Sequence, residues 1–338
     1  MTIREHITLA PFTSLGVGGP VRYLIEAEGP EELREARTFA HERGLPLRVL
    51  GAGTNVLVGD AGIEAIVVKL VGSACALTVD GEGAPLLVAD AATPWDTLVD
   101  TAAAQGLWGI ENLAGIPGSA AGALVQNIGA YGVELAGTFS YAETFDLTSG
   151  VEGRIESEGA ALSYRTSLFK SRPDLIITNI ALTLSREAQP RLTYPDLVRA
   201  REAGAPLTTP REIAAAVRAI RQEKFPRETE GGSAGSFFKN PVITAKKAQE
   251  LRVRYPELPL YPLLEGTVKV PLAWLLDHVL GLAGYRYGLV RLFERQPLVI
   301  VTSKGARAAD VEALAREVEQ RVQDTFGISI EREVESFC

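Results

Sequence analysis

A glycine- and proline-rich stretch at residues 115–123, which reads GIPGSAAGA, constrains this chain more than any other feature of its sequence. Glycine has no side chain and tolerates positive φ, so several glycines close together let a backbone approach a flat or charged ligand. Residues 126–132, QNIGAYG, add amide groups beside further glycines. The alternative is a buried seam of small residues, and the stretch alone leaves both interpretations open.

A second glycine loop, GAGTN at residues 51–55, follows an expected strand at residues 47–50. A Rossmann fingerprint requires a third small residue three positions later and a helix that starts there. Val56 occupies that position, and residues 56–58 are strand-like. The loop is therefore either a plain turn or a set of backbone N–H groups that surround an anion without a helix behind them. Two such loops in the N-terminal half favour a large ligand that contains a diphosphate.

Composition excludes several classes of function. A chain of 338 residues is too long for a single core, so we expect more than one domain. A net charge of −8 argues against sequence-independent nucleic-acid binding. We find no signal-peptide pattern and no apolar run long enough to cross a bilayer, and therefore expect a cytoplasmic protein without a membrane partner.

Cysteine and histidine are scarce. The two cysteines, Cys75 and Cys338, lie far apart, and the three histidines, His6, His41 and His278, are isolated from one another. The sequence therefore offers few residues for structural disulfides, metal sites or histidine-based triads, and we expect no metal.

Hydrophobic periodicity predicts a mixture of helices and strands. We expect a helix over residues 30–44 that ends at Gly44. A second helix begins near residue 93, with Thr93 as its cap and Asp96 at the capping-box position, and a third begins at Thr209. Near the C-terminus the pattern predicts a strand at 298–302, a helix at 311–323 and a strand at 328–330.

The two glycine loops carry a resemblance to a known domain. Residues 49–57 (VLGAGTNVL) together with GIPG at 115–118 resemble the FAD-binding domain shared by the vanillyl-alcohol oxidase and p-cresol methylhydroxylase superfamily. Within that superfamily, QNIGAYG at 126–132 is similar to the MurB family of enolpyruvyl reductases. The resemblance runs from about residue 12 to residue 334, with its motifs in the family's order.

This resemblance implies an α+β fold with an FAD-binding domain in two subdomains, at residues 1–70 and 71–220. A C-terminal α/β substrate-binding domain follows at residues 221–338. FAD should be bound non-covalently, because no histidine lies in the loops. The residues expected to contact FAD are Gly51, Gly53, Thr54, Asn55, Leu57, Gly115, Ile116, Pro117, Gly118, Ser119, Gly122, Ala123, Gln126, Asn127, Gly129 and Tyr131.

The resemblance also implies an activity. The enzyme would use NADPH and FAD to reduce UDP-N-acetylglucosamine enolpyruvate to UDP-N-acetylmuramate, a step of peptidoglycan synthesis that serves cell-wall biogenesis, cell shape and cell division. Hydride would reach the terminal methylene, and negative charge would develop at the neighbouring carbon and spread into the carboxylate. Such a reaction needs a fixed cation or donor at the carboxylate and an acid at the carbon. We expect a monomer whose partners are NADPH and this UDP-sugar, with no nucleic acid.

Three residues are identified as catalytic by the resemblance. Arg165, in YRTSLFK at 164–170, would pair with the carboxylate as a permanently charged planar fork. Ser236, in GSFFKNP at 235–241, would donate the proton to the carbanion. Glu333, in EREV at 331–334, matches the family position better than Glu331 and would hydrogen-bond the developing enolate or tune protonation. Without the resemblance, the simpler interpretation is that Arg165 is a surface residue, Ser236 part of a turn and Glu333 an ordinary glutamate.

The resemblance also implies residues that hold the substrate. Lys224 would meet phosphate and three others would add polar contacts, while the tyrosines match the subgroup that closes a tyrosine-bearing loop over the nucleotide. The full set is Tyr164, Tyr194, Lys224, Asn240, Tyr261, Lys269 and Gln296. Each of them alone would be an ordinary surface residue, and the case for them rests on their joint order and spacing.

Two alternatives remain at this point. An FAD-linked alcohol or hydroxy-acid oxidase of the same superfamily would be reoxidised rapidly by oxygen and would ignore a UDP-sugar. A flavin- or nucleotide-binding protein without turnover would leave Arg165, Ser236 and Glu333 without a chemical role.

Overall fold

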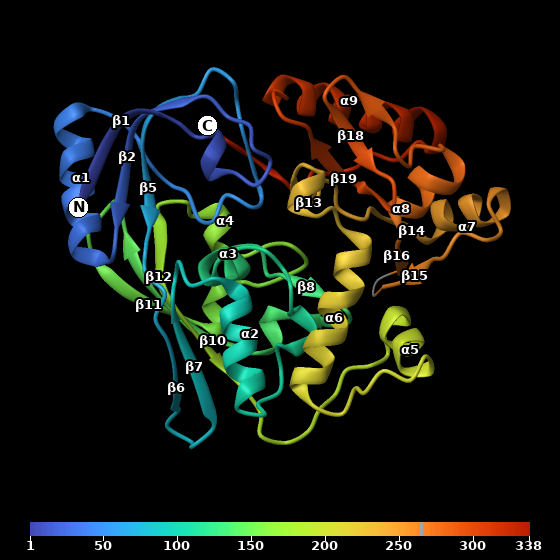
Figure 1. Ribbon diagram of the computed structural model, residues 1–338, viewed down its shortest axis with the longest axis horizontal. Coiled ribbons are helices and arrows are strands. Elements are labelled where there is room, and N and C mark those ends of the chain that lie inside the picture. The colour runs from blue at the N-terminus through green and yellow to red at the C-terminus, as the bar shows by residue number, and fades with distance from the viewer. Residues whose placement is uncertain (264–265) are drawn as a thin grey trace. The chain divides into compact units, whose positions relative to one another are not determined.

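The computed structural model describes residues 1–263 and 266–338, and these form two compact units (Figure 1). Unit 1 comprises Met1–Ile7, Val21–Gly53 and Glu64–Arg221. Unit 2 comprises Thr8–Pro20, Thr54–Ile63 and Gln222–Cys338. The glycine loop at residues 51–55 is thus shared between the units, while the division into domains at residues 70 and 220 stays a prediction.

The first sheet of unit 1 has the strand order β1-β2-β5-β3, with β3 parallel to β5. Its strands are β1 (Thr2–Thr8), β2 (Pro20–Ala27), β5 (Ile63–Leu70) and β3 (Leu47–Val49). Helix α1 (Pro30–Arg43) packs Leu33, Ala36 and Ala40 on this sheet. The predicted end of the helix is confirmed, because Gly44 has φ +61, a conformation that glycine adopts without strain.

The second sheet of unit 1 has the antiparallel order β11-β10-β12-β7-β6. Its strands are β6 (Cys75–Val79), β7 (Pro85–Asp90), β10 (Phe139–Asp146), β11 (Glu152–Glu156) and β12 (Leu175–Thr183), and β8 (Gly129–Ala130) pairs separately with β9 (Val133–Glu134). The other helices of this part are α2 (Trp95–Ala104), α3 (Ala120–Val125), α4 (Leu168–Ser171), α5 (Pro195–Glu202) and α6 (Pro210–Lys224). Apolar side chains of α2, α3 and α6 share one core with this sheet.

The predicted starts of two helices have different outcomes. At α6 the predicted start at Thr209 is confirmed, and the residue forms a capping box: Glu212 N–H donates to Thr209 Oγ1 at 3.2 Å, and Thr209 N–H donates to the Glu212 carboxylate at 2.9 Å. At α2 the prediction is wrong. Thr93 Oγ1 instead donates to Ala74 O at 2.9 Å, and Asp96 accepts from Gly115 N at 2.8 Å, because tertiary partners compete successfully for both side chains.

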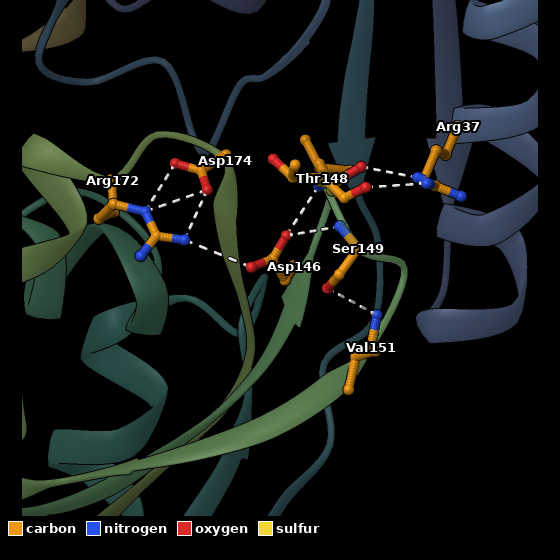
Figure 2. A network of polar contacts seen from close by, with 8 residues as sticks. Arg37, Asp146, Thr148, Ser149, Val151, Arg172 and Asp174 are labelled. Atoms are coloured by element: carbon orange, nitrogen blue, oxygen red, sulfur yellow. Dashed lines mark hydrogen bonds and ion pairs between the residues drawn. The ribbon is translucent and has the colours of Figure 1, made fainter.

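A polar network joins α1 to the turn between β10 and β11 (Figure 2). Asp146 Oδ1 accepts from the backbone N–H groups of Thr148 and Ser149 at 2.7 and 2.9 Å, and the Ser149 bond is the main cause that lowers the pKa of the Asp146 carboxyl. Arg37 donates to the carbonyls of Leu147 and Thr148 at 2.7 and 2.8 Å. The network therefore connects the two sheets of unit 1.

Unit 2 contains the sheet order β13-β19-β18-β17 and the smaller order β14-β16-β15. The strands are β13 (Gly232–Ser236), β14 (Val242–Thr244), β15 (Tyr261–Pro262), β16 (Thr267–Lys269), β17 (Arg286–Tyr287), β18 (Val290–Phe293) and β19 (Gln296–Thr302). The helices are α7 (Ala245–Arg254), α8 (Leu272–Trp274), continued by a π-helical turn at Leu275–Val279, and α9 (Ala308–Phe326). The predicted strand at 298–302 and helix at 311–323 are confirmed inside β19 and α9. Val311, Leu314 and Val318 of α9 join the core of this unit.

The predicted strand at 328–330 is wrong. Ile328 is buried in the core, but the backbone there is irregular, so the apolar pattern reports packing and not strand pairing. A strand forms later, at β20 (Glu335–Phe337), which runs parallel to β4 (Val56–Val58). This pairing joins the end of the chain to the residues just after the first glycine loop.

Candidate functional site

The loop at residues 115–118 is held from several directions within unit 1. Trp95 N–H donates to Gly118 O at 3.0 Å, and the Trp95 indole N–H donates to Leu113 O at 3.0 Å. Gly115 and Gly118 have φ +69 and +135, values that L side chains rarely adopt. Ser119 caps the short helix α3 by accepting from Gly122 N–H at 3.2 Å. The loop is thus held in place, and its first and last residues are glycines with positive φ.

The first glycine loop approaches the second one. A Cβ added at Gly51 would lie 3.7 Å from Ser119 Oγ, and Gly53 adopts φ +69. No helix follows Gly53, since the chain enters β4, so the expectation of a non-Rossmann loop is confirmed. The glycines of the two loops lie close together in unit 1. A site for the diphosphate of a dinucleotide needs backbone that an anion can approach closely, and the glycines provide it.

Asn55 of the same loop belongs to unit 2 and contacts the C-terminal segment. Its Nδ2 donates to Glu333 O at 3.0 Å, and its carbonyl accepts from Glu335 N–H at 3.0 Å. Leu57 is buried in β4, opposite Ser336. One predicted cofactor residue therefore fixes the backbone of one predicted catalytic residue.

The QNIGAYG segment is held by its own polar side chains. Asn127 is fully buried with φ +38, donates to Ser163 O at 2.9 Å and accepts from Ala136 N–H at 3.0 Å. Tyr131 is also buried, and its ring meets that of Tyr194 edge to face with centroids 5.2 Å apart. Burial is the main cause that raises the pKa of Tyr131 to about 12, and a hydrogen bond with Arg221 opposes the shift. These two side chains therefore position the loop.

Arg165 occupies a tight turn beside that segment. Ser163 and Thr166 pair across it with two backbone bonds of 3.0 Å each, and Arg165 adopts φ +54. The left-handed conformation costs a non-glycine residue about 1–2 kcal/mol, which the surrounding contacts must offset. Arg165 Nη2 donates to Gly129 O at 2.7 Å, and Nη1 lies 3.5 Å from Asn127 O. The guanidinium is thus pre-oriented on two carbonyls.

Ser236 and Glu333 lie on neighbouring segments of unit 2. Glu333 N–H donates to Phe237 O at 2.8 Å, and Phe238 pairs with Arg332 in an antiparallel bridge. Ser236 itself pairs with Val299 at the end of β13. Two motifs almost a hundred residues apart in sequence are therefore joined by backbone hydrogen bonds.

The neighbours of Glu333 have other partners. Glu331 is exposed and forms an ion pair with Lys239 at 3.0 Å. Arg332 binds Glu319 and Glu312 of α9, and the hydrogen bond to Glu319 is the main cause that raises its pKa. Both neighbours of Glu333 are therefore held by ion pairs, Glu331 to Lys239 and Arg332 to α9.

Some predicted substrate residues lie together. In the small sheet of unit 2, Lys269 is the register partner of both Val242 and Tyr261, and Asn240 lies two residues before β14. Asn240 Oδ1 accepts from Leu272 N–H at 2.9 Å, so its carbonyl oxygen has a structural role. Gln296 begins β19 opposite Phe293, and Lys224 ends α6.

Tyr164, Arg165 and Tyr194 belong to unit 1, whereas Ser236 and Glu333 belong to unit 2. Tyr194 precedes α5, whose first residue is Pro195, a position that suits proline. The convergence of all predicted site residues on one bound ligand stays a prediction.

Sequence reasoning missed three charged residues that support the loop at 115–118. They are Asp96 of α2 and Arg218 and Arg221 of α6, and all three contact Gly115 or one another. The i, i+3 spacing of the two arginines places them on one face of α6, which is the one signal that the sequence offered.

A cavity of about 640 Å³ in unit 1 does not coincide with these residues. It is lined by α1, β3 and the β10–β11 turn, including Arg37, His41, Arg48 and Leu147. None of the predicted cofactor- or substrate-binding residues lines it, so the candidate site rests on loop geometry and not on this cavity.

Comparison with known proteins defines the class. A profile described as "FAD binding domain" matches residues 21–145, and a profile described as "UDP-N-acetylenolpyruvoylglucosamine reductase, C-terminal domain" matches residues 226–337. The chain is therefore a flavoenzyme built from an FAD-binding domain and a reductase C-terminal domain.

Relatives along the whole chain define the family. UDP-N-acetylenolpyruvoylglucosamine reductase of Pseudomonas aeruginosa is 37% identical over 335 residues, which cover 98% of each chain. The reductase of Shewanella sp. (strain MR-4) is 36% identical over 96% of this chain and 94% of its own. The crystal structure of the enzyme from Thermus caldophilus aligns over 100% of both chains with a TM-score of 0.69 and 29% identity. The chain belongs to the UDP-N-acetylenolpyruvoylglucosamine reductase (MurB) family.

Family membership confirms several predictions. The fold class is confirmed as an α+β protein with an FAD-binding domain and a MurB C-terminal domain. The enzyme class, an FAD-dependent oxidoreductase, and the cofactors, FAD with NADPH as co-substrate, are confirmed as well. Membership favours the reductase over both alternatives considered from the sequence. Within the described ranges, no helix is long and apolar enough to span a bilayer.

Proposed function

We propose that this enzyme reduces UDP-N-acetylglucosamine enolpyruvate to UDP-N-acetylmuramate with NADPH, in the cytoplasm and as a monomer. Bound FAD would supply the hydride chemistry of this reaction, with NADPH as the source of the hydride and the methylene carbon of the enolpyruvyl group as its acceptor. The neighbouring carbon then gains an electron pair and must receive a proton, so the net change is addition of H⁻ and H⁺ across one C=C bond while NADPH becomes NADP⁺.

Arg165 stabilises the charge that spreads into the substrate carboxylate. The proposal is supported by its two carbonyl contacts, to Gly129 and Asn127, because they orient the planar guanidinium before substrate arrives. A donor fixed in advance needs little reorganisation as charge develops.

Ser236 donates the proton to the carbon, and Glu333 hydrogen-bonds the developing enolate or assists the serine. A serine hydroxyl is a weak acid, so it can act only beside a group that helps it and only toward a strongly basic carbon. The observation that carries this proposal is the 2.8 Å bond from Glu333 N–H to Phe237 O, which joins the segments of the two residues.

Substrate binding uses Lys224, Asn240, Lys269 and Gln296, with Tyr164, Tyr194 and Tyr261 as aromatic contacts of the tyrosine-bearing loop subgroup. The exposed rings of Tyr194 and Tyr261 support this role, because such side chains can cover a nucleotide. NADPH and the UDP-sugar use the same pocket in turn, since both must reach one reactive edge of the flavin.

Single-turnover absorbance of the flavin tests the role of Ser236. For Ser236→Ala we expect NADPH to bleach the flavin absorbance at the wild-type rate. Recovery of the absorbance on addition of the enolpyruvyl substrate should be slower by about 10²–10⁴-fold, which is the usual contribution of a positioned acid. Ser329→Ala, which removes an exposed hydroxyl elsewhere in unit 2, should recover within twofold of wild type. Normal recovery in Ser236→Ala would remove the serine from this role.

A further inference from the structure

Both hydrogen-bonding groups of Gly115 are held by charged side chains. Its N–H donates to Asp96 Oδ1 at 2.8 Å, and its carbonyl accepts from Arg221 Nε at 2.9 Å. The peptide units on either side of this residue cannot rotate unless a charge-assisted hydrogen bond breaks. Such bonds contribute more than bonds between neutral groups.

Asp96 is itself held by an arginine. Arg218 Nε donates to Asp96 Oδ2 at 2.9 Å, and its Nη2 donates to Asp100 Oδ1 at 2.7 Å. The hydrogen bond to Asp96 is the main cause that raises the pKa of Arg218. Asp96 is 39% exposed and Asp100 is 66% exposed, so the inner carboxylate is the better shielded of the two.

Glycine at position 115 is required by this arrangement. Its φ is +69, and an added Cβ would lie 3.2 Å from Arg218 Cγ and 3.4 Å from Arg221 Cδ. The two arginine stems therefore pack directly against the backbone. Trp95 holds residues 113 and 118 on either side, so Asp96, Arg218 and Arg221 fix the middle of the loop.

We propose that Asp96 and Arg218 are positioning residues for FAD: they hold the backbone at residues 115–118 in its binding conformation before the cofactor arrives. This inference rests on the proposed assignment of that loop to FAD. A loop already ordered in the free protein loses less conformational entropy on binding, and the affinity for the cofactor rises accordingly. Neither side chain touches FAD in this role.

The helices that carry the pair do not depend on it. Leu98 and Val99 of α2, and Ile213 and Val217 of α6, are fully buried in the same core. Loss of the half-exposed Asp96–Arg218 pair should therefore loosen the loop and leave the helices folded.

Titration of the FAD-free protein with FAD, followed by the loss of flavin fluorescence, tests the inference. For Asp96→Ala we expect the Kd for FAD to rise about tenfold and the dissociation rate to rise with it. Asp100→Ala, on the same helix and with the same change in charge, removes only the outer bond of Arg218 and should bind within twofold of wild type. Hydrogen exchange of Gly115 N–H should become faster in Asp96→Ala and stay unchanged in Asp100→Ala.

A second variant separates positioning from folding. If Asp96→Ala unfolds, Arg218→Gln serves instead. This variant leaves Asp96 in place as the acceptor for Gly115 N–H but removes the arginine that holds Asp96, and it should raise the Kd for FAD about threefold. At saturating FAD, kcat of the folded variants should stay within twofold of wild type. A Kd within twofold of wild type in folded Asp96→Ala, or a fall in kcat with unchanged Kd, would overturn the inference. The titration needs no UDP-sugar, so a wild-type protein that binds FAD but fails to turn over would contradict the proposed function alone.

Discussion

The predicted cofactor loops of unit 1 and the predicted catalytic segments of unit 2 are built differently. In unit 1, the loops proposed to hold FAD are fixed by side chains: Asp96, Arg221 and Asn127 bind backbone groups directly. In unit 2, backbone hydrogen bonds join the segments of Ser236 and Glu333 to each other, and one side chain, Asn55, adds a bond to Glu333 O. Substitutions in the first region should therefore loosen a binding surface, whereas substitutions in the second should remove chemistry without disturbing the scaffold.

The sharpest test of this contrast compares two glutamates two residues apart. Glu333→Gln should lower the rate of substrate-dependent flavin reoxidation about 10²-fold or more, because a neutral amide cannot assist a proton transfer. Glu331→Gln removes an exposed carboxylate that pairs with Lys239 and should stay within twofold of wild type. Both should keep the wild-type unfolding temperature. Equal effects in the two variants would mean that the assignment of Glu333 is wrong.

Alkaline pH should weaken unit 1 through Tyr131. Its folded-state pKa of about 12 lies above the ordinary value of 10, so the folded protein holds this proton more tightly than the unfolded chain. The contribution is complete below pH 10 and is lost as pH rises toward 12, with a size of roughly 2–3 kcal/mol. Unfolding measured from pH 9 to 12 should therefore show a shallower decline in Tyr131→Phe than in wild type. Tyr287→Phe, which alters an exposed ring of unit 2, should decline as wild type does.

Gly115→Ala should damage cofactor binding more than stability. The left-handed φ and the 3.2 Å approach to Arg218 Cγ together should lower the free energy of unfolding by about 1–2 kcal/mol. We also expect at least a tenfold rise in the Kd for FAD, measured by fluorescence titration. Gly137→Ala is a suitable control, since a Cβ there meets nothing within 4 Å. Wild-type affinity in Gly115→Ala would show that the loop tolerates another conformation.

The smallest expected effect concerns the start of α6, which carries Arg218 and Arg221. Thr209→Ala removes half of the capping box and should lower the free energy of unfolding by about 1 kcal/mol, measured by urea denaturation. Thr209→Ser retains the hydroxyl and should lie close to wild type. FAD affinity should change little in either variant, and a large loss would show that the arginines depend on the cap.

The sequence predicted the regular part of the fold well. The apolar faces of α1 and α9 and the glycine that ends α1 are local signals, and local signals were sufficient there. The strand expected at 328–330 failed because Ile328 is buried by packing without strand pairing. A periodic pattern reports which side chains are buried and does not report what their backbone pairs with.

The site was predictable only in part. Arg165, Ser236 and Glu333 were identified through resemblance, since no local pattern distinguishes a catalytic serine from a turn serine. Asp96 was interpreted as a helix cap because its true partner, Gly115, lies 19 residues away and Arg218 lies 122 residues away. Such contacts depend on the tertiary fold, and a single sequence does not encode them in any local spacing.

The central proposal is that Arg165, Ser236 and Glu333 act on one substrate. A crystal structure with FAD and the enolpyruvyl substrate bound tests it directly. The account predicts Ser236 Oγ about 3–3.5 Å from the carbon that receives the proton, the Arg165 guanidinium on the carboxylate and Glu333 beside the same group. A complex in which Arg165 lies away from the substrate that Ser236 and Glu333 contact would contradict it.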